Sequence, residues 1–259
     1  MAIVKTDSKH YTNIATKIRE KTGGDETYTP SKMADGVDAV FDAGKKAEHD
    51  AFWDAITDNG NRTNYQYAFW YQGVEYLRPN RKIIPTSLTG NLFMYCNKLK
   101  KVEAEYFDLS KASIGTSGTT SSMYYTFAYC YDLEEIEDIG LSPSYIYSYT
   151  FYSCKKLRKI AKITVDADTR FNNSFAYCTS LEEVLFEGEI GQNGLTLQYS
   201  TTLNKASIVS IINCLSTNTS GLTVTLSKTA VNNAFEGGST GSEWLNLIAA
   251  KSNWTISLV

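Results

Sequence analysis

The sequence has little of what most catalytic and metal sites are built from. It has only two histidines, His10 and His49, and both lie well ahead of the repeats described below. It contains no CxxC pair, no HExxH or GxSxG motif and no glycine-rich phosphate loop. Because catalysis needs a positioned nucleophile, base or metal, we expect no enzymatic activity, no cofactor and no metal ion.

The chain also lacks a large net charge and long apolar runs. The 25 basic and 28 acidic residues give a formal net charge of −3 over 259 residues, which gives no electrostatic reason to expect nucleic acid or an anionic membrane as a partner. The first residues, Met1–Asp7, contain no apolar run suited to a signal peptide, and no segment is long enough to span a bilayer. These features predict synthesis in a cytosol and no membrane insertion.

The chain does contain a repeated frame, Phe-x2-Cys-x2-Leu-x2-Val/Ile. Its cysteines are spaced by 34, 24 and 24 residues, and the period of 24 falls in the range of leucine-rich repeats. The frame predicts a solenoid whose Phe, Cys and Leu side chains face the interior, followed by strands that stack in parallel. The four copies are Phe93/Cys96/Leu99/Val102, Phe127/Cys130/Leu133/Ile136, Phe151/Cys154/Leu157/Ile160 and Phe175/Cys178/Leu181/Val184.

Two further patterns follow the same frame. The cysteines, together with Cys214 in an apolar run, are interpreted as small buried side chains rather than as disulfides or metal ligands. The two residues after each repeat Leu alternate in sign, so neighbouring strands attract in this register, and we interpret them as register control rather than as a charged ligand site. These pairs are Lys100-Lys101, Glu134-Glu135, Arg158-Lys159 and Glu182-Glu183.

Tyrosine and asparagine recur at two positions of the frame, two residues before the Phe and one before the Cys. Aligned rings with polar tips suit a glycan or a protein partner, but such rings can also pack between repeats and complete the core. Both interpretations stay open at this point. The candidate receptor-binding residues are Asn91, Tyr95, Tyr125, Tyr129, Tyr149, Asn173 and Tyr177.

Residues 1–58 are predicted to form short amphipathic helices. They cannot bury their apolar faces alone, so we favour attachment or self-association, with an N-terminal cap of the solenoid as the alternative. A further apolar face is offered by Phe52, Trp53 and Ile56. The candidate attachment residues are Ile14, Ile18, Met33, Val37, Val40 and Phe41.

The segments on either side of the repeats are predicted to close the stack. Residues 59–91 form the N-terminal cap, with alternating aromatics over 65–71 and residues 81–84 as short strands. Residues 201–259 form an αβ capping module, in which Asn204 caps a helix over 203–215. A strand over 222–226, helices near 229–235 and 243–251, and a final strand over 254–259 complete it.

Two parts of the chain resemble known protein families. The repeats over 92–190 resemble BspA-like leucine-rich repeats, which implies a surface protein, adhesin or interaction module. The sequence Ile14-Ala15-Thr16-Lys17-Ile18-Arg19-Glu20-Lys21-Thr22-Gly23, with 28–34, resembles a segment of phage and prophage tail and baseplate proteins, although Val37 replaces an Ile. That resemblance implies a virion protein.

The expected protein is thus an α+β chain with N-terminal helices (1–58), a solenoid cap (59–91), leucine-rich repeats (92–200) and a C-terminal cap (201–259). We expect a phage or prophage tail, baseplate or fibre protein located in the virion. Its partners are other virion proteins and a host-surface glycan or protein, and it is a homo-oligomer; phage fibres imply a trimer. The alternatives are a decoration protein without a receptor, a bacterial adhesin or interaction module and, last, an enzyme acting through paired carboxylates.

Overall fold

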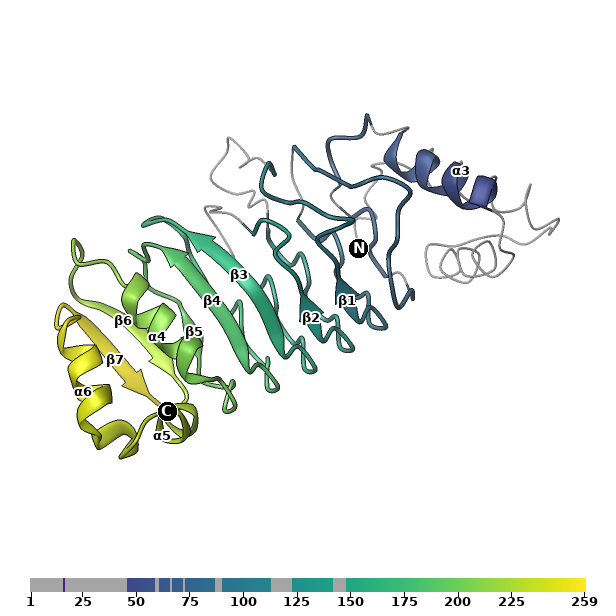
Figure 1. The fold of residues 1–259 in the computed structure, drawn as a ribbon. Coiled ribbons are helices and arrows are strands. Elements are labelled where there is room, and N and C mark those ends of the chain that lie inside the picture. Colours follow the sequence, from purple (N-terminus) through teal and green to yellow (C-terminus); the bar gives the residue numbers. More distant parts are fainter. Residues whose placement is uncertain are drawn as a thin grey trace, which may run out of the picture.

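The computed structural model describes Thr16 and residues 46–58, 61–65, 67–71, 73–86, 90–112, 123–141 and 148–259. Helices and strands are mixed, and the strands pair in parallel within two sheets (Figure 1). The first sheet contains β1 (Lys101–Val102), β2 (Glu135–Ile136), β3 (Lys159–Val165) and β4 (Glu183–Gly188) in chain order. The second contains β5 (Thr196–Leu197), β6 (Leu222–Leu226) and β7 (Trp254–Leu258). Within this part of the chain, no helix is long and apolar enough to cross a membrane.

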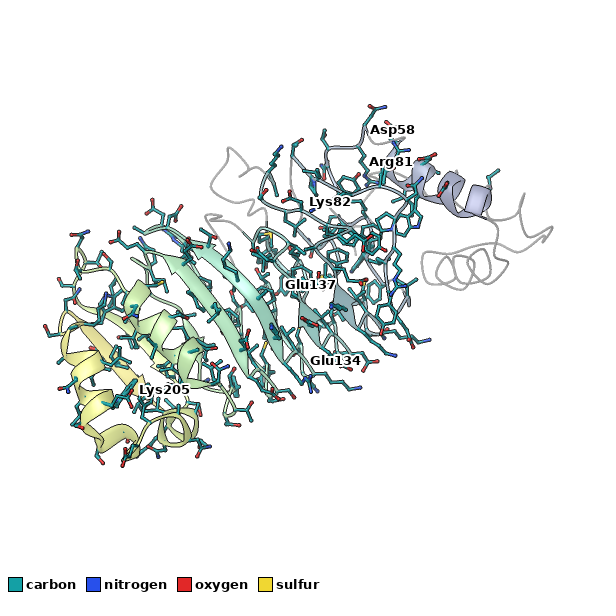
Figure 2. All side chains as sticks on the ribbon, viewed as in Figure 1. Asp58, Arg81, Lys82, Glu134, Glu137 and Lys205 are labelled. Carbon is teal, nitrogen blue, oxygen red and sulfur yellow. The ribbon has the colours of Figure 1, made fainter. Side chains whose placement is uncertain are left out.

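The first sheet confirms the register predicted from charge alternation. Lys101 pairs with Glu135, Glu135 with Lys159, and Lys159 with Glu183 across successive strands. The ammonium of Lys101 lies 3.2 Å from the Glu135 carboxylate, and that of Lys159 lies 3.2 Å from the Glu183 carboxylate. Figure 2 shows the charged side chains along this sheet, including Glu134 beside β2. Opposite charges therefore face each other across each pair of neighbouring strands, which stabilises this pairing.

The core contains a column of stacked phenylalanines, one from each repeat. We call each repeat, with its Phe turn and the strand that follows, a rung. Neighbouring rings lie 5.2–5.6 Å apart with interplanar angles of 5–24°, and all are buried. Such stacking adds to the burial of apolar area and fixes the spacing between rungs. The column consists of Phe69, Phe93, Phe127, Phe151 and Phe175.

The rungs extend beyond the four copies of the sequence frame. At the start, residues 67–71 form a turn whose Phe69 ring stacks on Phe93 at 5.4 Å, so the predicted strand over 65–71 is wrong. The aromatic alternation imitates a strand, but Tyr67 and Tyr71 have positive φ angles of 60° and 59°, which no strand permits. The predicted strand over 81–84 is reduced to one bridge between Ile83 and Phe107.

At the end of the repeats, Leu197 takes the place of the phenylalanine. Its carbonyl accepts a hydrogen bond from the Ser200 N–H, as each repeat Phe carbonyl accepts from its Cys N–H. The Ser200 hydroxyl donates to the Cys178 carbonyl on the preceding rung at 3.1 Å. A sixth rung therefore follows the four that the sequence frame identifies and the one at Phe69.

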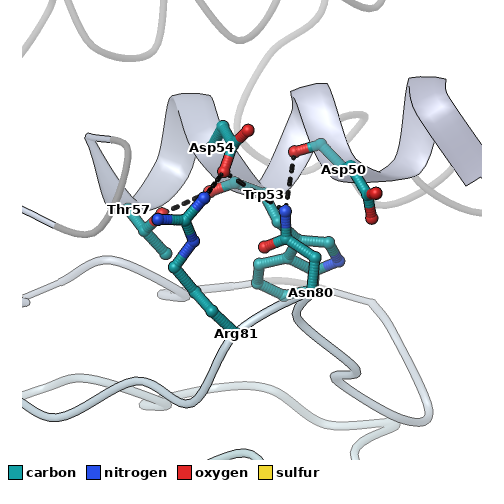
Figure 3. A network of polar contacts seen from close by, with 6 residues as sticks. All are labelled: Asp50, Trp53, Asp54, Thr57, Asn80 and Arg81. Carbon is teal, nitrogen blue, oxygen red and sulfur yellow. Dashed lines mark hydrogen bonds and ion pairs between the residues drawn. The ribbon is translucent and has the colours of Figure 1, made fainter.

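Helix α3 (Lys46–Thr57) caps the first rung. Trp53 and Ile56 are buried, and the indole of Trp53 lies 6.0 Å from the Phe69 ring. The side chains of Asn80 and Arg81 bind the helix through Asp54 (Figure 3). The apolar side of α3 is thus packed on the first rung, and attachment or self-association through residues 1–58 stays a prediction. The candidate attachment residues, Ile14, Ile18, Met33, Val37, Val40 and Phe41, lie outside the described residues.

The C-terminal module has the predicted αβααβ order. It comprises α4 (Lys205–Cys214), β6, α5 (Lys228–Ala234), a 3₁₀ turn η1 (Gly238–Thr240), α6 (Ser242–Ala249) and β7. Asn204 is the N-cap of α4, since its side-chain oxygen accepts from the Ser207 N–H at 2.9 Å. The hydroxyls of Ser207 and Ser210 accept hydrogen bonds from the main-chain N–H groups of Val184 and Phe186. Helix α4 thereby provides hydrogen-bond acceptors for main-chain N–H groups on the outer edge of β4, which would otherwise be unpaired.

Candidate functional site

All seven candidate receptor-binding residues adopt the left-handed backbone conformation. Their φ angles lie between 53° and 62°, at the two positions that flank each central Phe or its equivalent. Asparagine tolerates this conformation better than most residues with a Cβ, which suits Asn91 and Asn173 at the position two residues before the phenylalanine. The residues are Asn91, Tyr95, Tyr125, Tyr129, Tyr149, Asn173 and Tyr177.

The main chain of these turns hydrogen-bonds from rung to rung. On the third rung, the N–H groups of Tyr125, Phe127 and Tyr129 donate to carbonyls of the fourth, at 3.4, 2.8 and 2.8 Å. The same alternate residues do so on neighbouring rungs. The flanking side chains are consequently held at a fixed height, two per rung, with one on each side of the phenylalanine column.

A continuous aromatic row, which we call the tyrosine ladder, is formed by the tyrosines one residue before the cysteine position and, on the fourth rung, by the tyrosine two residues before it. Its successive ring centroids lie 4.5, 4.4, 5.4, 5.5 and 4.8 Å apart. The spacing is that of stacked strands, so the ladder rises with the sheet. Its members are Tyr71, Tyr95, Tyr129, Tyr152, Tyr177 and Tyr199.

Three ladder members were missed by the sequence prediction. Tyr71 lies 24 residues before Tyr95, the repeat spacing itself, but its rung has no cysteine to align. Tyr199 lies on the rung where Leu and Ser replace Phe and Cys. Tyr152 occupies the position next to the one expected, because the fourth rung has Ser153 there.

A second, shorter column lies on the other side of the phenylalanines. Tyr125 and Tyr149 stack at 4.9 Å with 17° between their planes. The amide of Asn173 donates to the Tyr149 hydroxyl at 3.1 Å and continues the column with a polar group. Asn91, at its other end, is only 8% exposed and is therefore covered by its neighbours.

The ladder rings are neither fully buried nor free. Tyr71 and Tyr177 are 46% and 43% exposed, and the other four are half-buried. Within the stacked pairs each ring thus covers the face of its neighbour, and part of the ring remains exposed to solvent. The two interpretations of these columns are compatible, because a half-buried ring covers its neighbours and still leaves part of its surface accessible.

The environment raises the pKa of three ladder phenols, those of Tyr95, Tyr129 and Tyr177. Burial raises the pKa of Tyr95 and of Tyr129, and the neighbouring phenols add to the effect. For Tyr177 the pKa is raised mainly by the nearby Tyr199 and Tyr152 phenols. At neutral pH these hydroxyls therefore donate and accept hydrogen bonds without carrying charge.

The cysteines are free and buried, as predicted. Each repeat thiol also donates to a main-chain carbonyl of the preceding rung, over 2.7–3.1 Å. Burial raises the pKa of the Cys178 thiol to about 12, and those of Cys130 and Cys154 also rise well above the ordinary value. These thiols are therefore unreactive as nucleophiles in the folded chain. Among the described residues, no group of three or more His, Cys, Asp or Glu side chains could hold a metal ion.

The comparison with protein families agrees with the stacked rungs. The family model described as a BspA type leucine rich repeat region matches residues 86–219 in 6 copies, which is just over half of the chain. Searches of curated proteins and of solved structures find no match. Leucine-rich repeats are typical of protein-interaction and surface modules, and they say little about the particular partner. The chain belongs to the BspA-type leucine-rich repeat family.

Proposed function

We propose that the rungs form a solenoid that recognises a host surface, within a structural protein of a phage or prophage tail, baseplate or fibre. The tyrosine ladder carries this proposal, because it aligns neutral, half-exposed phenol groups along successive rungs. Rings with an apolar body and a polar tip are enriched where proteins bind partners. The role is binding, without catalysis or a cofactor.

The phage assignment rests on the resemblance of residues 14–34 to tail and baseplate proteins. Helix α3 buries its apolar side on the first rung through Trp53 and Ile56. Attachment to other virion proteins and self-association are therefore assigned to residues 1–45. The proposed particle-bound form is a homo-oligomer, with a trimer as the form that phage fibres imply.

A second candidate is a bacterial surface adhesin or protein-interaction module, and the family match favours it. A third is a decoration protein that binds the particle and no receptor. The three differ in location and in cell binding. Electron microscopy with antibody labelling separates particle from cell surface, and sedimentation gives the oligomeric state. A monomer that is absent from particles would exclude the virion role.

Host recognition is tested with the labelled full-length protein on cells of its native host and of close relatives. We expect the double variant Tyr129→Ala/Tyr177→Ala to weaken cell binding by about tenfold or more, since two ladder rings are lost. Tyr76→Ala is the matched control, because Tyr76 is 45% exposed but belongs to neither column. Equal loss in both variants, or no binding by the unaltered protein, would contradict the proposal.

A further inference from the structure

The orientation of the ring planes in the tyrosine ladder changes on the fourth rung. Its first three rings stack face to face, with interplanar angles of 4° and 3°, and its last two stack with an angle of 25°. Between these two stacks stands Tyr152, whose ring plane makes angles of 66° with Tyr129 and 86° with Tyr177. One ring is thus turned across the row.

A single departure from the repeat frame accounts for this turn. The position before the repeat cysteine is Tyr129 on the third rung and Tyr177 on the fifth, but Ser153 on the fourth. Ser153 has the same φ angle of 62° as both tyrosines, so the backbone is unchanged and only the ring is missing. A small side chain therefore leaves a gap one ring wide in the ladder.

Tyr152 fills this gap from the adjacent position. The equivalent residue is Ala128 on the third rung and Ala176 on the fifth, and both are buried. Small side chains on the two neighbouring rungs leave room for the Tyr152 ring to lie between the stacks. Its centroid is 5.4 Å from that of Tyr129 and 5.5 Å from that of Tyr177.

As a consequence, Tyr152 presents a ring face at the side of the ladder, where the other ladder rings present their edges. Tyr129 and Tyr177 each turn one face toward the gap, because the other face is covered by the next ring of its own stack. Tyr152 meets these faces with its edges, so its own two faces point sideways. Tyr149 approaches it at 5.5 Å, and no other ring among the described residues covers the remaining side. Tyr152 itself is half-buried.

Polar groups lie beside Tyr152 in the second column. The hydroxyl of Tyr149 is held by the Asn173 amide at 3.1 Å. The two lysines that follow the fourth-rung cysteine are directed to other partners: Lys156 is paired with Asp132 at 2.7 Å, and the ammonium of Lys155 lies 5.6 Å from the centre of the Tyr131 ring. An aromatic face bordered by hydroxyl and amide groups matches the C–H face and the hydroxyls of a sugar ring better than it matches an ion.

We propose that the face of Tyr152, at the gap left by Ser153, is a subsite for one pyranose ring of a neutral glycan. The proposal rests on the proposed host-recognition function and specifies its ligand. A pyranose ring stacks its apolar C–H groups on the phenol ring, and its hydroxyls bond to the Tyr149 and Asn173 side chains. The stacked rings on either side supply edges and hydroxyls for neighbouring sugar units.

The test uses the full-length protein and neutral tetrasaccharides of known composition, namely cellotetraose, chitotetraose and mannotetraose, with binding measured by calorimetry and by saturation-transfer NMR. At least one of them is expected to bind. Tyr152→Ala should weaken that binding by about tenfold or more, and Tyr152→Phe by no more than about threefold, because the ring face is kept. Ser153→Tyr should weaken binding as strongly as Tyr152→Ala, since the restored ring displaces Tyr152. The control is Tyr76→Ala, and circular dichroism verifies that each variant folds.

Absence of binding to all three tetrasaccharides overturns the subsite, and so does binding that Tyr152→Ala and Ser153→Tyr leave unchanged. Cell binding measured in parallel separates this outcome from failure of host recognition. Cell binding that is lost after protease treatment of the cells, with no tetrasaccharide bound, indicates a protein receptor, which overturns the glycan subsite but keeps host recognition. Tetrasaccharide binding without cell binding keeps the subsite and overturns host recognition.

Discussion

The thiol of Cys154 donates a hydrogen bond to the main-chain carbonyl of Phe127 on the preceding rung, with 3.0 Å between Sγ and O. That carbonyl also accepts from the Cys130 N–H at 3.2 Å, so it has two donors. The cysteine column therefore ties each rung to the one before it, in addition to filling space in the core. Sulfur suits both tasks, because it is weakly polar and its thiol is a modest donor.

This bond predicts an unusual order of stability among variants at this position. Cys154→Ala removes the donor and leaves a small void, so we expect it to lower the free energy of unfolding by about 1–3 kcal/mol. Cys154→Ser keeps a donor, and it should be about 1 kcal/mol more stable than Cys154→Ala. Urea denaturation measures both. If the thiol served only as a small apolar group, the serine variant would instead be the less stable one.

The contact of α3 with the first rung predicts that loss of a buried apolar side chain lowers the stability of the protein much more than loss of an exposed charged one. Trp53 is 2% exposed against Phe69, so Trp53→Ala should destabilise the protein by about 3–5 kcal/mol. The side chain of Arg81 is 42% exposed in its ion pair with Asp54, and Arg81→Ala should cost less than about 1 kcal/mol. Urea denaturation compares the two variants. A similar cost for both would mean that polar contacts, rather than burial, hold the helix in place.

Backbone strain and ring stacking can be separated within the ladder position itself. Ser153 has a φ angle of 62° and no ring, so Ser153→Gly relieves left-handed strain and should stabilise the protein by up to about 1 kcal/mol. Tyr95 has a φ angle of 62° as well, but its ring stacks on two others at 4.5 and 4.4 Å. Tyr95→Gly should therefore destabilise by about 1–2 kcal/mol, since two stacking contacts are lost. Thermal unfolding would contradict this account if both glycine variants changed stability in the same direction.

The sequence was sufficient to predict the rungs wherever the repeat frame is intact. Phe, Cys and Leu at fixed spacing identified the core of the central rungs, and the alternating charges identified the strand register. The C-terminal elements followed from capping and periodicity, as at Asn204. These features depend on local chemistry or on side chains that repeat one position per rung, which is the kind of information that a single sequence carries.

Prediction failed where a rung is built from substitute residues. Phe69 lacks a cysteine three residues later, and Leu197 stands where a phenylalanine is expected. The aromatic alternation around Phe69 imitates a strand, because hydrophobic period does not reveal the sign of φ. The ladder itself was only partly found, since Tyr152 reaches its place through the absence of a ring at Ser153. That relationship exists between neighbouring rungs in space, so no pattern within one repeat can show it.

The acid sensitivity of the stack can be predicted from Glu137. Its carboxylate accepts from the Lys101 ammonium at 2.7 Å and from the Ala104 N–H at 2.8 Å, and these bonds lower its pKa below the ordinary value of 4.5. The unfolded chain therefore takes up a proton at a higher pH than the folded chain does. The stability that Glu137 contributes is fully present above pH 4.5 and is lost as the pH falls below it, through the lowered pKa of the folded state.

Urea denaturation at pH 7 and at pH 3 measures this effect. The unaltered protein should lose stability between the two, and Glu137→Gln should lose less, because it has no carboxylate to protonate. At pH 7 the variant should be the less stable of the pair, since the glutamine cannot form the charged contact with Lys101. Glu236→Gln, a change at an exposed carboxyl group in the C-terminal module, is the matched control. An equal loss of stability in Glu137→Gln and in the unaltered protein would show that acid weakens the rungs through other carboxylates.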